Sequence, residues 1–174
     1  MRRAWVLVAA VSAVVYANSL GGGFHYDDEH SVEANPYVRS LGNVPRFFAD
    51  PTMFSVDAEK GMYRPVLLVT YAVNFALGEF DVWGYHAVNV GVHAANACLV
   101  WWLASLLGLS APGAALAGLL FAVHPACSEP VNYISSRSES LAALFYLLAL
   151  SLWLRVGGRG RLVPAVWACS PSPR

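Results

Sequence analysis

Residues 86–107, HAVNVGVHAANACLVWWLASLL, form the longest of four apolar stretches in the chain. A bilayer hydrocarbon core of ~30 Å needs roughly 20 helical residues to cross it, so this stretch predicts a membrane-spanning helix. The overall composition agrees, because 57% of the 174 residues are hydrophobic and only 13% are charged. Soluble domains usually have about 45–50% apolar and about 25% charged residues. A soluble fold is therefore disfavoured.

Three further apolar stretches predict additional spans. They are Ala4–Leu20, Ala111–Val123 and Leu141–Leu154. Glycines or prolines separate the stretches, as expected where the chain turns, and Ser136 with Glu139 predicts a capping box before the last one. We therefore predict an all-α fold, a polytopic transmembrane helical bundle of about four spans. A cleaved signal peptide is an alternative for the first stretch, because Met-Arg-Arg followed by apolar residues also fits that pattern.

Arginines flank the predicted bundle at both ends. They are Arg2, Arg3, Arg155, Arg159 and Arg161. The positive-inside rule places both groups in the cytoplasm, which requires an even number of crossings. The segment Tyr63–Leu77, YRPVLLVTYAVNFAL, is then expected to be an interfacial or re-entrant helix, because it is too short to span unaided. This topology puts residues 21–85 and 124–137 on one extracytoplasmic face.

The prediction divides the chain into a transmembrane module, residues 1–160, and a tail, residues 161–174, interpreted as a truncation point of a longer protein. Within the module, residues 21–63 form an extracytoplasmic loop and residues 64–77 the interfacial helix. Eleven basic and eleven acidic residues with no basic run argue against nucleic acid as a partner. Cys98, Cys127 and Cys169 share no close spacing, which predicts neither a disulfide framework nor a thiolate metal site.

The sequence FHYDDEH at residues 24–30 follows the first apolar stretch directly. Asp27 and Asp28 are candidates for a general base or for binding a cation, because adjacent carboxylates repel unless their charge is offset. His25, Asp27 and His30 could also bind a divalent metal, and no other cofactor is indicated. The alternative is a solvated acidic loop without a chemical role.

A second polar cluster, HPACSEPVN at residues 124–132, follows the third apolar stretch. Ionisable groups at the end of a membrane helix are costly unless they pair or line an aqueous cavity. Glu129 and Arg137 are therefore candidates for a functional site. The alternative is a buried Glu129–Arg137 ion pair that only ties two helices together.

Four polar residues form a stripe on the helix predicted at residues 86–107. His86, Asn89, His93 and Asn96 are three, four and three positions apart, which places them on one helix face. Such a stripe must face protein or water rather than lipid. Hydrogen bonding between helices is favoured for the deeper His93 and Asn96, whereas His86 and Asn89 are expected to face the same cavity as Asp27.

Arg64 heads the predicted interfacial helix, next to Pro65. A guanidinium group matches a phosphate with two parallel hydrogen bonds, so Arg64 is a candidate anion-binding residue. The alternative is that its side chain only extends to lipid headgroups.

Five motifs occur in a fixed order. They are FHYDD at 24–28, YRPVL at 63–67, GYHAVNVGVH at 84–93, HPACSEPV at 124–131 and SRSESL at 136–141. Together they resemble the amino-terminal membrane region of the tetratricopeptide-repeat (TPR) containing O-mannosyltransferases, over about residues 4–155. The resemblance implies a fold like the amino-terminal half of a C-type glycosyltransferase. It also implies a donor sugar on a polyprenyl phosphate and a Ser or Thr hydroxyl as acceptor.

The residues expected to be catalytic are Asp27, Asp28 and Glu129: the resemblance places the acidic pair on Asp27 and Asp28, and it matches Glu129 in the fourth motif. The residues expected to bind substrate are Arg64, His86, Asn89, His124 and Arg137. In the implied reaction, Asp27 or Asp28 takes the proton of the acceptor hydroxyl while Arg64 or Arg137 stabilises the departing phosphate.

The predicted protein is thus a multi-pass membrane glycosyltransferase that moves a sugar, mannose by resemblance, on the extracytoplasmic face of a bacterial inner membrane or the endoplasmic reticulum. Its expected partners are a lipid-linked sugar donor, a protein acceptor and membrane lipid. Two alternatives remain open. One is an ion- or proton-coupled transporter in which the polar stripe and the acids form a path, and the other is a non-catalytic membrane fragment.

Overall fold

The computed structural model describes residues 3–158, and this part of the chain is helical without strands. The α-helices are α1 (Ala4–Val15), α2 (Val44–Phe47), α3 (Pro65–Gly78), α4 (Val82–Leu106), α5 (Ala111–Val123), α6 (Ser128–Asn132) and α7 (Arg137–Trp153). Short 3₁₀ or π turns, labelled η1 to η8, are Ala17–Gly21, Glu29–Glu33, Pro36–Arg39, Leu41–Asn43, Pro51–Phe54, Ala58–Lys60, Pro125–Cys127 and Leu154–Gly158. The predicted tail, residues 161–174, and the arginines at 2, 159 and 161 lie outside the described residues.

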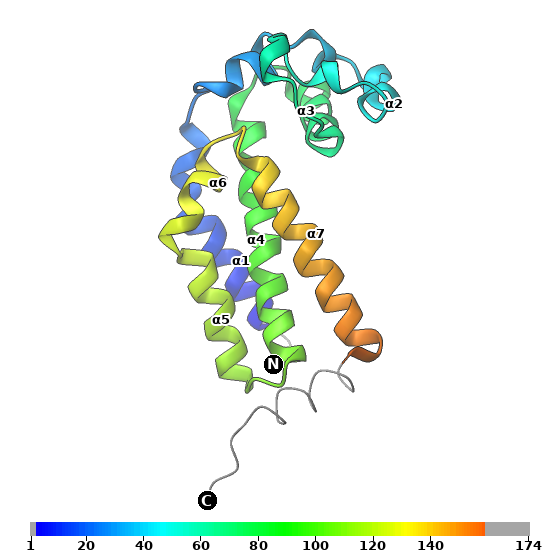
Figure 1. Ribbon diagram of the computed structural model, residues 1–174. Helices are drawn as coiled ribbons and strands as arrows, with labels where there is room; N and C mark the ends of the chain where they lie inside the picture. Colours follow the sequence, from blue (N-terminus) through cyan, green and yellow to red (C-terminus); the bar gives the residue numbers. More distant parts are fainter. Residues whose placement is uncertain (1–2, 159–174) are drawn as a thin grey trace, which may run out of the picture.

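The long helices form a bundle around α4, which packs against α1, α5 and α7 (Figure 1). Residues 22–64 and the helix α3 form a layer across one end of this bundle, hereafter the loop layer. The turn between α5 and α7 reaches the same end, whereas α1 begins and α7 finishes at the opposite end. The segment around Asp28 and the segment around Ser135, about 100 residues apart in sequence, are thereby brought together.

Two helical segments are long and apolar enough to cross a membrane, α4 and Arg137–Gly157. A third candidate consists of α5 continued by Pro125–Asn132 across a 51° bend. The first predicted span, Ala4–Leu20, is shorter than expected, because the α-helix ends at Val15 and a 3₁₀ turn follows. Twelve residues of α-helix reach roughly 18 Å. The part of the chain that the structure describes therefore has two or three candidate spans.

Helix starts follow local side-chain chemistry. The Asp81 carboxylate accepts a hydrogen bond from the Trp83 N–H at the start of α4, and the Ser110 hydroxyl does so from the Gly113 N–H at the start of α5. The predicted capping box at Ser136 is wrong. A capping residue normally has extended backbone angles, but Ser136 has helical ones (φ −74°, ψ −1°), and the Glu139 N–H donates to the Ser136 carbonyl instead.

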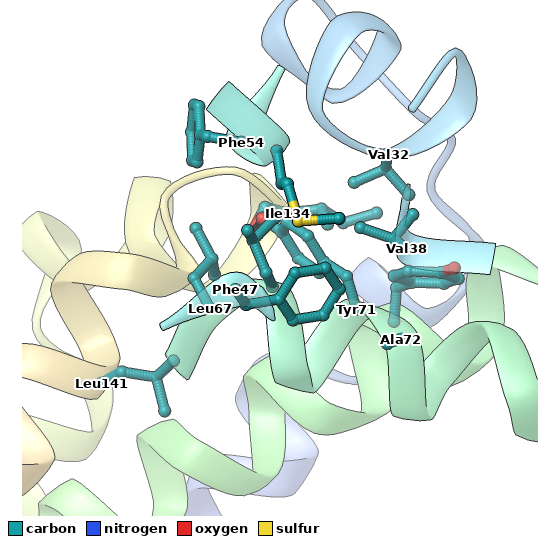
Figure 2. Close-up of a cluster of buried hydrophobic side chains, with 12 residues drawn as sticks. Val32, Val38, Phe47, Phe54, Leu67, Tyr71, Ala72, Ile134 and Leu141 are labelled. Carbon is teal, nitrogen blue, oxygen red and sulfur yellow. Dashed lines mark hydrogen bonds between the residues drawn. The ribbon is translucent and has the colours of Figure 1, made fainter. Parts of the chain in front are cut away.

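The loop layer has a hydrophobic core of its own (Figure 2). The buried side chains come from the loop, from α3 and α4, from the segment before α7, and from α7 itself. They are Val32, Val38, Phe47, Met53, Phe54, Leu67, Leu68, Tyr71, Ala72, Tyr85, Ile134 and Leu141. Each large apolar side chain that is fully buried contributes about 1.5–3 kcal/mol of transfer free energy. The predicted loop 21–63 is therefore a packed layer, held on a helix at 65–78 that matches the predicted 64–77 to within one residue.

The polar stripe of α4 faces protein. His86, Asn89, His93 and Asn96 are each at most 2% exposed. The His93 Nε2–H donates to the Ala122 carbonyl of α5 (3.1 Å), and the Asn96 amide donates to the Ser140 carbonyl of α7 (2.9 Å). The predicted interhelix role of these two residues is thereby confirmed.

A glycine lies where three helices of the bundle are in close contact. A Cβ atom placed on Gly118 of α5 would lie 2.9 Å from Trp101 Cβ of α4 and 3.2 Å from a methyl group of Val8 on α1. Small residues at such crossings let helix backbones pack closely. Gly118 therefore sets the spacing of three helices.

Candidate functional site

A cavity of about 240 Å³ lies between the loop layer and the segment that precedes α7. Three of the predicted site residues line it: Asp27, Arg64 and Glu129. They come from the FHYDDEH segment, from the start of α3 and from α6. We call it the loop cavity. The fold thus gathers two of the predicted carboxylates and one guanidinium from three distant parts of the chain, and Glu139 of α7 adds a third carboxylate to the lining.

Asp27 presents its carboxylate to the loop cavity, with 57% of its side chain exposed. Its own N–H donates to the Tyr133 hydroxyl (2.8 Å). Its Oδ1 lies 3.4 Å from His30 Nε2 and 3.8 Å from Lys60 Nζ. An exposed carboxylate that is held through its backbone and flanked by nitrogen groups can accept a proton from a substrate.

Asp28 is fully buried and has a different environment from its neighbour. Its carboxylate accepts hydrogen bonds from the His25 N–H (3.0 Å), from the Ser135 N–H (2.8 Å) and from the Ser135 hydroxyl. Charge-assisted bonds of this kind are among the stronger hydrogen bonds in proteins. Asp28 therefore joins the FHYDDEH segment to the turn before α7.

A left-handed turn precedes the two acids. Tyr26 has φ +48°, a conformation that is uncommon for residues other than glycine. The Asp28 and Glu29 N–H groups donate to the His25 and Tyr26 carbonyls, so a helical turn starts at this point. Neighbouring side chains on such a turn diverge, which is consistent with one exposed and one buried carboxylate.

Arg64 is half-buried at the wall of the loop cavity. Its guanidinium donates to the Ser138 hydroxyl (2.9 Å) and lies 5.8 Å from the ring centroid of Phe54. No carboxylate pairs with it within 4.0 Å among residues 3–158. Its positive charge is thus free of a protein counter-ion in the described structure.

A second hollow, of about 450 Å³, lies between α3 and α7 and also has Arg64 in its wall. Its remaining lining is mainly apolar and includes Val66, Leu67, Leu141, Ala142 and Phe145. We call it the apolar groove. The loop cavity and the apolar groove share Arg64, Leu67, Ser138 and Glu139, so the two spaces adjoin.

Arg137 is fully buried rather than exposed at the cavity. Its guanidinium donates to Asn89 Oδ1 (2.6 Å), Asn74 Oδ1 (2.8 Å), the Thr70 hydroxyl (3.0 Å) and the Tyr85 carbonyl (2.8 Å). It also lies 5.0 Å from the ring centroid of Tyr71. Uncharged groups of α3 and α4 thus surround this cation and tie both helices to α7.

The Glu129–Arg137 ion pair, considered as an alternative, does not form in the described structure. The ion pairs found in residues 3–158 both involve Asp27, whereas Glu129 is exposed and Arg137 is buried. The physical reason is that the two asparagine oxygens and the Tyr85 carbonyl already take the Arg137 donors.

The other predicted substrate-binding residues do not line the loop cavity. His86 is 1% exposed and packs against the Gly22 backbone, where an added Cβ would lie 2.8 Å from its Nε2. Asn89 is buried and donates to the Val131 carbonyl. His124 is exposed, and its Nδ1 accepts from the Ala126 N–H.

Two tyrosines that the sequence did not predict, Tyr71 and Tyr133, also line the cavity. Burial raises the pKa of the Tyr133 phenol, against the opposing effect of the Asp27 N–H that binds its oxygen. Burial likewise raises the pKa of Tyr71, against the opposing effect of Arg137. Both phenols therefore stay protonated at neutral pH. Tyr133 follows the HPACSEPVN cluster by one position, a signal that could have included it.

A metal site from FHYDDEH is not assembled. Within the described residues, no three His, Cys, Asp or Glu side chains are placed to hold one metal ion. Of the proposed trio, Asp27 and His30 are close to each other through His30 Nε2, and the other ring nitrogen of His30 contacts the Ser55 hydroxyl. Cys98 and Cys127 are free thiols, and Cys169 lies outside the described part of the chain.

Comparison with known proteins identifies relatives that match most of this chain. Protein O-mannosyl-transferase Tmtc1 of Drosophila melanogaster is 37% identical over 146 residues, which are 81% of this chain and 17% of that protein. Protein O-mannosyl-transferase TMTC2 of Homo sapiens is 32% identical over 152 residues, 84% of this chain and 18% of the relative. Protein O-mannosyl-transferase TMTC3 of Homo sapiens is 30% identical over 155 residues, which are 87% of this chain and 17% of that protein.

The chain spans less than a fifth of the length of these curated relatives. No family model matches it, and no solved structure matches it.

Proposed function

Because this chain belongs to the TMTC family of protein O-mannosyl-transferases, we propose that it forms part of the active site of a membrane glycosyltransferase. In this proposal a sugar, mannose by the names of the relatives, passes from a polyprenyl-phosphate donor to a Ser or Thr hydroxyl of a protein. The observation that carries the proposal is the loop cavity, where Asp27, Arg64 and Glu129 meet beside an apolar groove.

The donor is proposed to lie across both spaces. Its phosphate binds Arg64, which has no carboxylate partner in the described structure and already points toward the Ser138 hydroxyl. Its isoprenoid chain follows the apolar groove between α3 and α7, where burial of apolar surface is favourable. Its sugar then occupies the loop cavity, with Glu129 available to bind sugar hydroxyls.

The transfer is a single displacement. The acceptor oxygen attacks the anomeric carbon and forms the new glycosidic bond, while the bond from that carbon to the phosphate oxygen breaks. Asp27 takes the hydroxyl proton, and Arg64 stabilises the negative charge on the departing phosphate. Inversion at the anomeric carbon follows from attack on the face opposite to the phosphate. We assign the base role to Asp27 rather than to Asp28, because three donors already bind the buried Asp28 carboxylate.

Replacement of Arg64 by alanine tests this function. A charge-assisted hydrogen bond contributes roughly 1.5–3 kcal/mol, so Arg64→Ala should lower transfer from a labelled polyprenyl-phosphate mannose to a Ser/Thr peptide by roughly tenfold to hundredfold. Arg64→Lys should restore only part of it, because the ammonium keeps the charge and loses the paired geometry. The measurement uses the purified full-length protein that carries this sequence.

The matched control is Arg46→Ala, since Arg46 is an exposed arginine of the loop layer that lines neither space. It should leave transfer unchanged. Absence of transfer from every polyprenyl-phosphate donor, together with ion flux through reconstituted vesicles, would reject the enzyme and favour the transporter.

The membrane arrangement is part of the proposal. We propose that α1, α4, α5 and α7 all cross the bilayer, as in the amino-terminal half of a C-type glycosyltransferase, and that the loop layer faces the extracytoplasmic side. The loop layer and the turn before α7 share one end of the bundle, which supports a common face for both. Arg3 and Arg155 lie on segments that share the opposite end, in agreement with the positive-inside rule.

Single cysteines in a cysteine-free background test this topology. Glu33, Asn132 and Val156 are exposed positions in the loop layer, in α6 and after α7. Cysteines at Glu33 and Asn132 should react with a membrane-impermeant maleimide from the extracytoplasmic side, and a cysteine at Val156 should react only after permeabilisation. Labelling of Glu33 and Asn132 from opposite sides would exclude a common loop cavity in the membrane.

A further inference from the structure

His30 lies between the candidate base and a serine of the loop layer. Its Nδ1 is 2.9 Å from the Ser55 hydroxyl, and its Nε2 is 3.4 Å from Asp27 Oδ1. The side chain is only 12% exposed, and its ring leans against Phe54 at 6.5 Å between centroids. The His30 carbonyl also accepts from the Val56 N–H. The imidazole is therefore fixed on both sides while it remains in the wall of the loop cavity.

The neighbours of His30 indicate which ring nitrogen carries the proton, because the Asp27 carboxylate only accepts hydrogen bonds whereas the Ser55 hydroxyl can also donate one. Ser55 Oγ already accepts the Asp57 N–H (2.9 Å), so its own hydroxyl hydrogen is available to His30 Nδ1. With Nδ1 as the acceptor, a neutral imidazole bears its hydrogen on Nε2. That hydrogen faces the carboxylate of Asp27.

We infer that His30 is a positioning residue for Asp27, an inference that rests on the proposed function. The Nε2–H binds one carboxylate oxygen, Oδ1, and leaves Oδ2 for the acceptor hydroxyl. The Asp27 N–H bond to Tyr133 fixes the backbone of the same residue, so both ends of the base are held. The 3.4 Å separation is long for a hydrogen bond, and such contacts often tighten only when substrate is bound.

Kinetics of His30 variants test the inference. His30→Leu should lower kcat by about tenfold or more, because a base that is misplaced by about 1 Å can lose 10²-fold, while the KM for the lipid-linked donor stays the same. His30→Gln keeps an N–H donor in reach of Asp27 and should restore part of kcat. In an Asp27→Asn background, His30→Leu should have almost no further effect, because the group it positions is already absent.

A serine pair provides the matched control. Ser55→Ala removes the hydroxyl that faces His30, whereas Ser40→Ala removes one that likewise accepts the N–H two positions later, from Gly42, but faces no histidine. Ser55→Ala should lower kcat several-fold and Ser40→Ala should not. Additive effects of His30→Leu and Asp27→Asn, or equal effects of the two serine changes, would overturn the inference.

A spectroscopic measurement separates this inference from the proposed function. In a long-range ¹H–¹⁵N correlation spectrum of the detergent-solubilised protein, the His30 signal, identified by its loss in His30→Gln, should show the Nε2–H tautomer. Ser55→Ala should shift that signal. A wild-type protein that transfers no sugar would reject the proposed function. An Nδ1–H tautomer would reject the positioning role whether or not sugar is transferred.

Discussion

Sugar transfer falls by about 10²-fold or more when Asp27 is replaced by asparagine, if Asp27 is the general base. Asparagine keeps the shape of the side chain but cannot take a proton at neutral pH. The Asp27 side chain is largely exposed, and its contacts to His30 and Lys60 are long, so the fold should tolerate the change. Initial rates with a labelled polyprenyl-phosphate mannose, together with the thermal midpoint of the same preparation, measure both effects.

The neighbouring acid, Asp28, is the control for this experiment, because its replacement should lower stability, whereas replacement of Asp27 should lower transfer alone. Asp28→Asn should lower the thermal midpoint, because the buried carboxylate accepts three hydrogen bonds from His25 and Ser135. Any loss of transfer in Asp28→Asn should accompany this loss of stability. A folded, stable Asp28→Asn protein without activity, next to an active Asp27→Asn protein, would exchange the roles of the two acids.

Replacement of Arg137 by alanine should cause the largest loss of stability, of several kcal/mol, because each buried acceptor that loses its donor costs about 1–3 kcal/mol. The change leaves Asn74, Asn89 and Tyr85 with buried acceptors that have lost their donor. Arg137→Lys should fall between wild type and alanine, because an ammonium cannot reach all four acceptors. Thermal unfolding in detergent, followed by circular dichroism, measures the difference.

Arg155→Ala is the matched control for this change, since Arg155 lies at the other end of the same helical segment and is exposed. Its loss should alter the midpoint little. A normal midpoint for Arg137→Ala with a raised KM for the lipid-linked donor would instead support the phosphate-binding role that the sequence suggested for Arg137.

The sequence predicted the helical nature of the described chain and most helix positions, for physical reasons that act locally. Long apolar runs bounded by glycine and proline located α4, and a shorter run after Pro65 located α3. The end of α1 at Val15 was not predicted, because the mixed polarity of residues 16–20 gives no clear stop signal. In the structure the Ser19 hydroxyl donates to the Tyr16 carbonyl, and the chain continues as a 3₁₀ turn.

The candidate site was predicted only in part. Asp27, Arg64 and Glu129 meet in the loop cavity. This could be predicted, because all three residues flank apolar segments that were expected to end on the same side of the bundle. The division between Asp27 and Asp28 depends on a left-handed Tyr26 and on Ser135, 107 residues beyond Asp28. The burial of Arg137 likewise depends on side chains of two other helices. Sequence patterns carry no information on such distant contacts.

Two residues of the polar stripe on α4 hold helices together. His93 and Asn96 bond to carbonyls of α5 and α7, so these two polar groups tie helices together. The carboxylates of Asp27 and Glu129 gather at the loop end of the bundle rather than along the stripe. This distribution supports the proposal that the reaction takes place at the loop layer.

The bonds that close the loop layer also impose an order on biosynthesis. The ribosome makes Asp28, Asn74 and Asn89 well before Ser135 and Arg137, their partners in the folded protein. Until α7 emerges, the FHYDDEH segment has no anchor at Ser135, and the amide oxygens of α3 and α4 have no cation to bind. The nascent protein can therefore complete the contacts that bury Asp28 and leave Asp27 exposed only after the segment around Ser135 has been made.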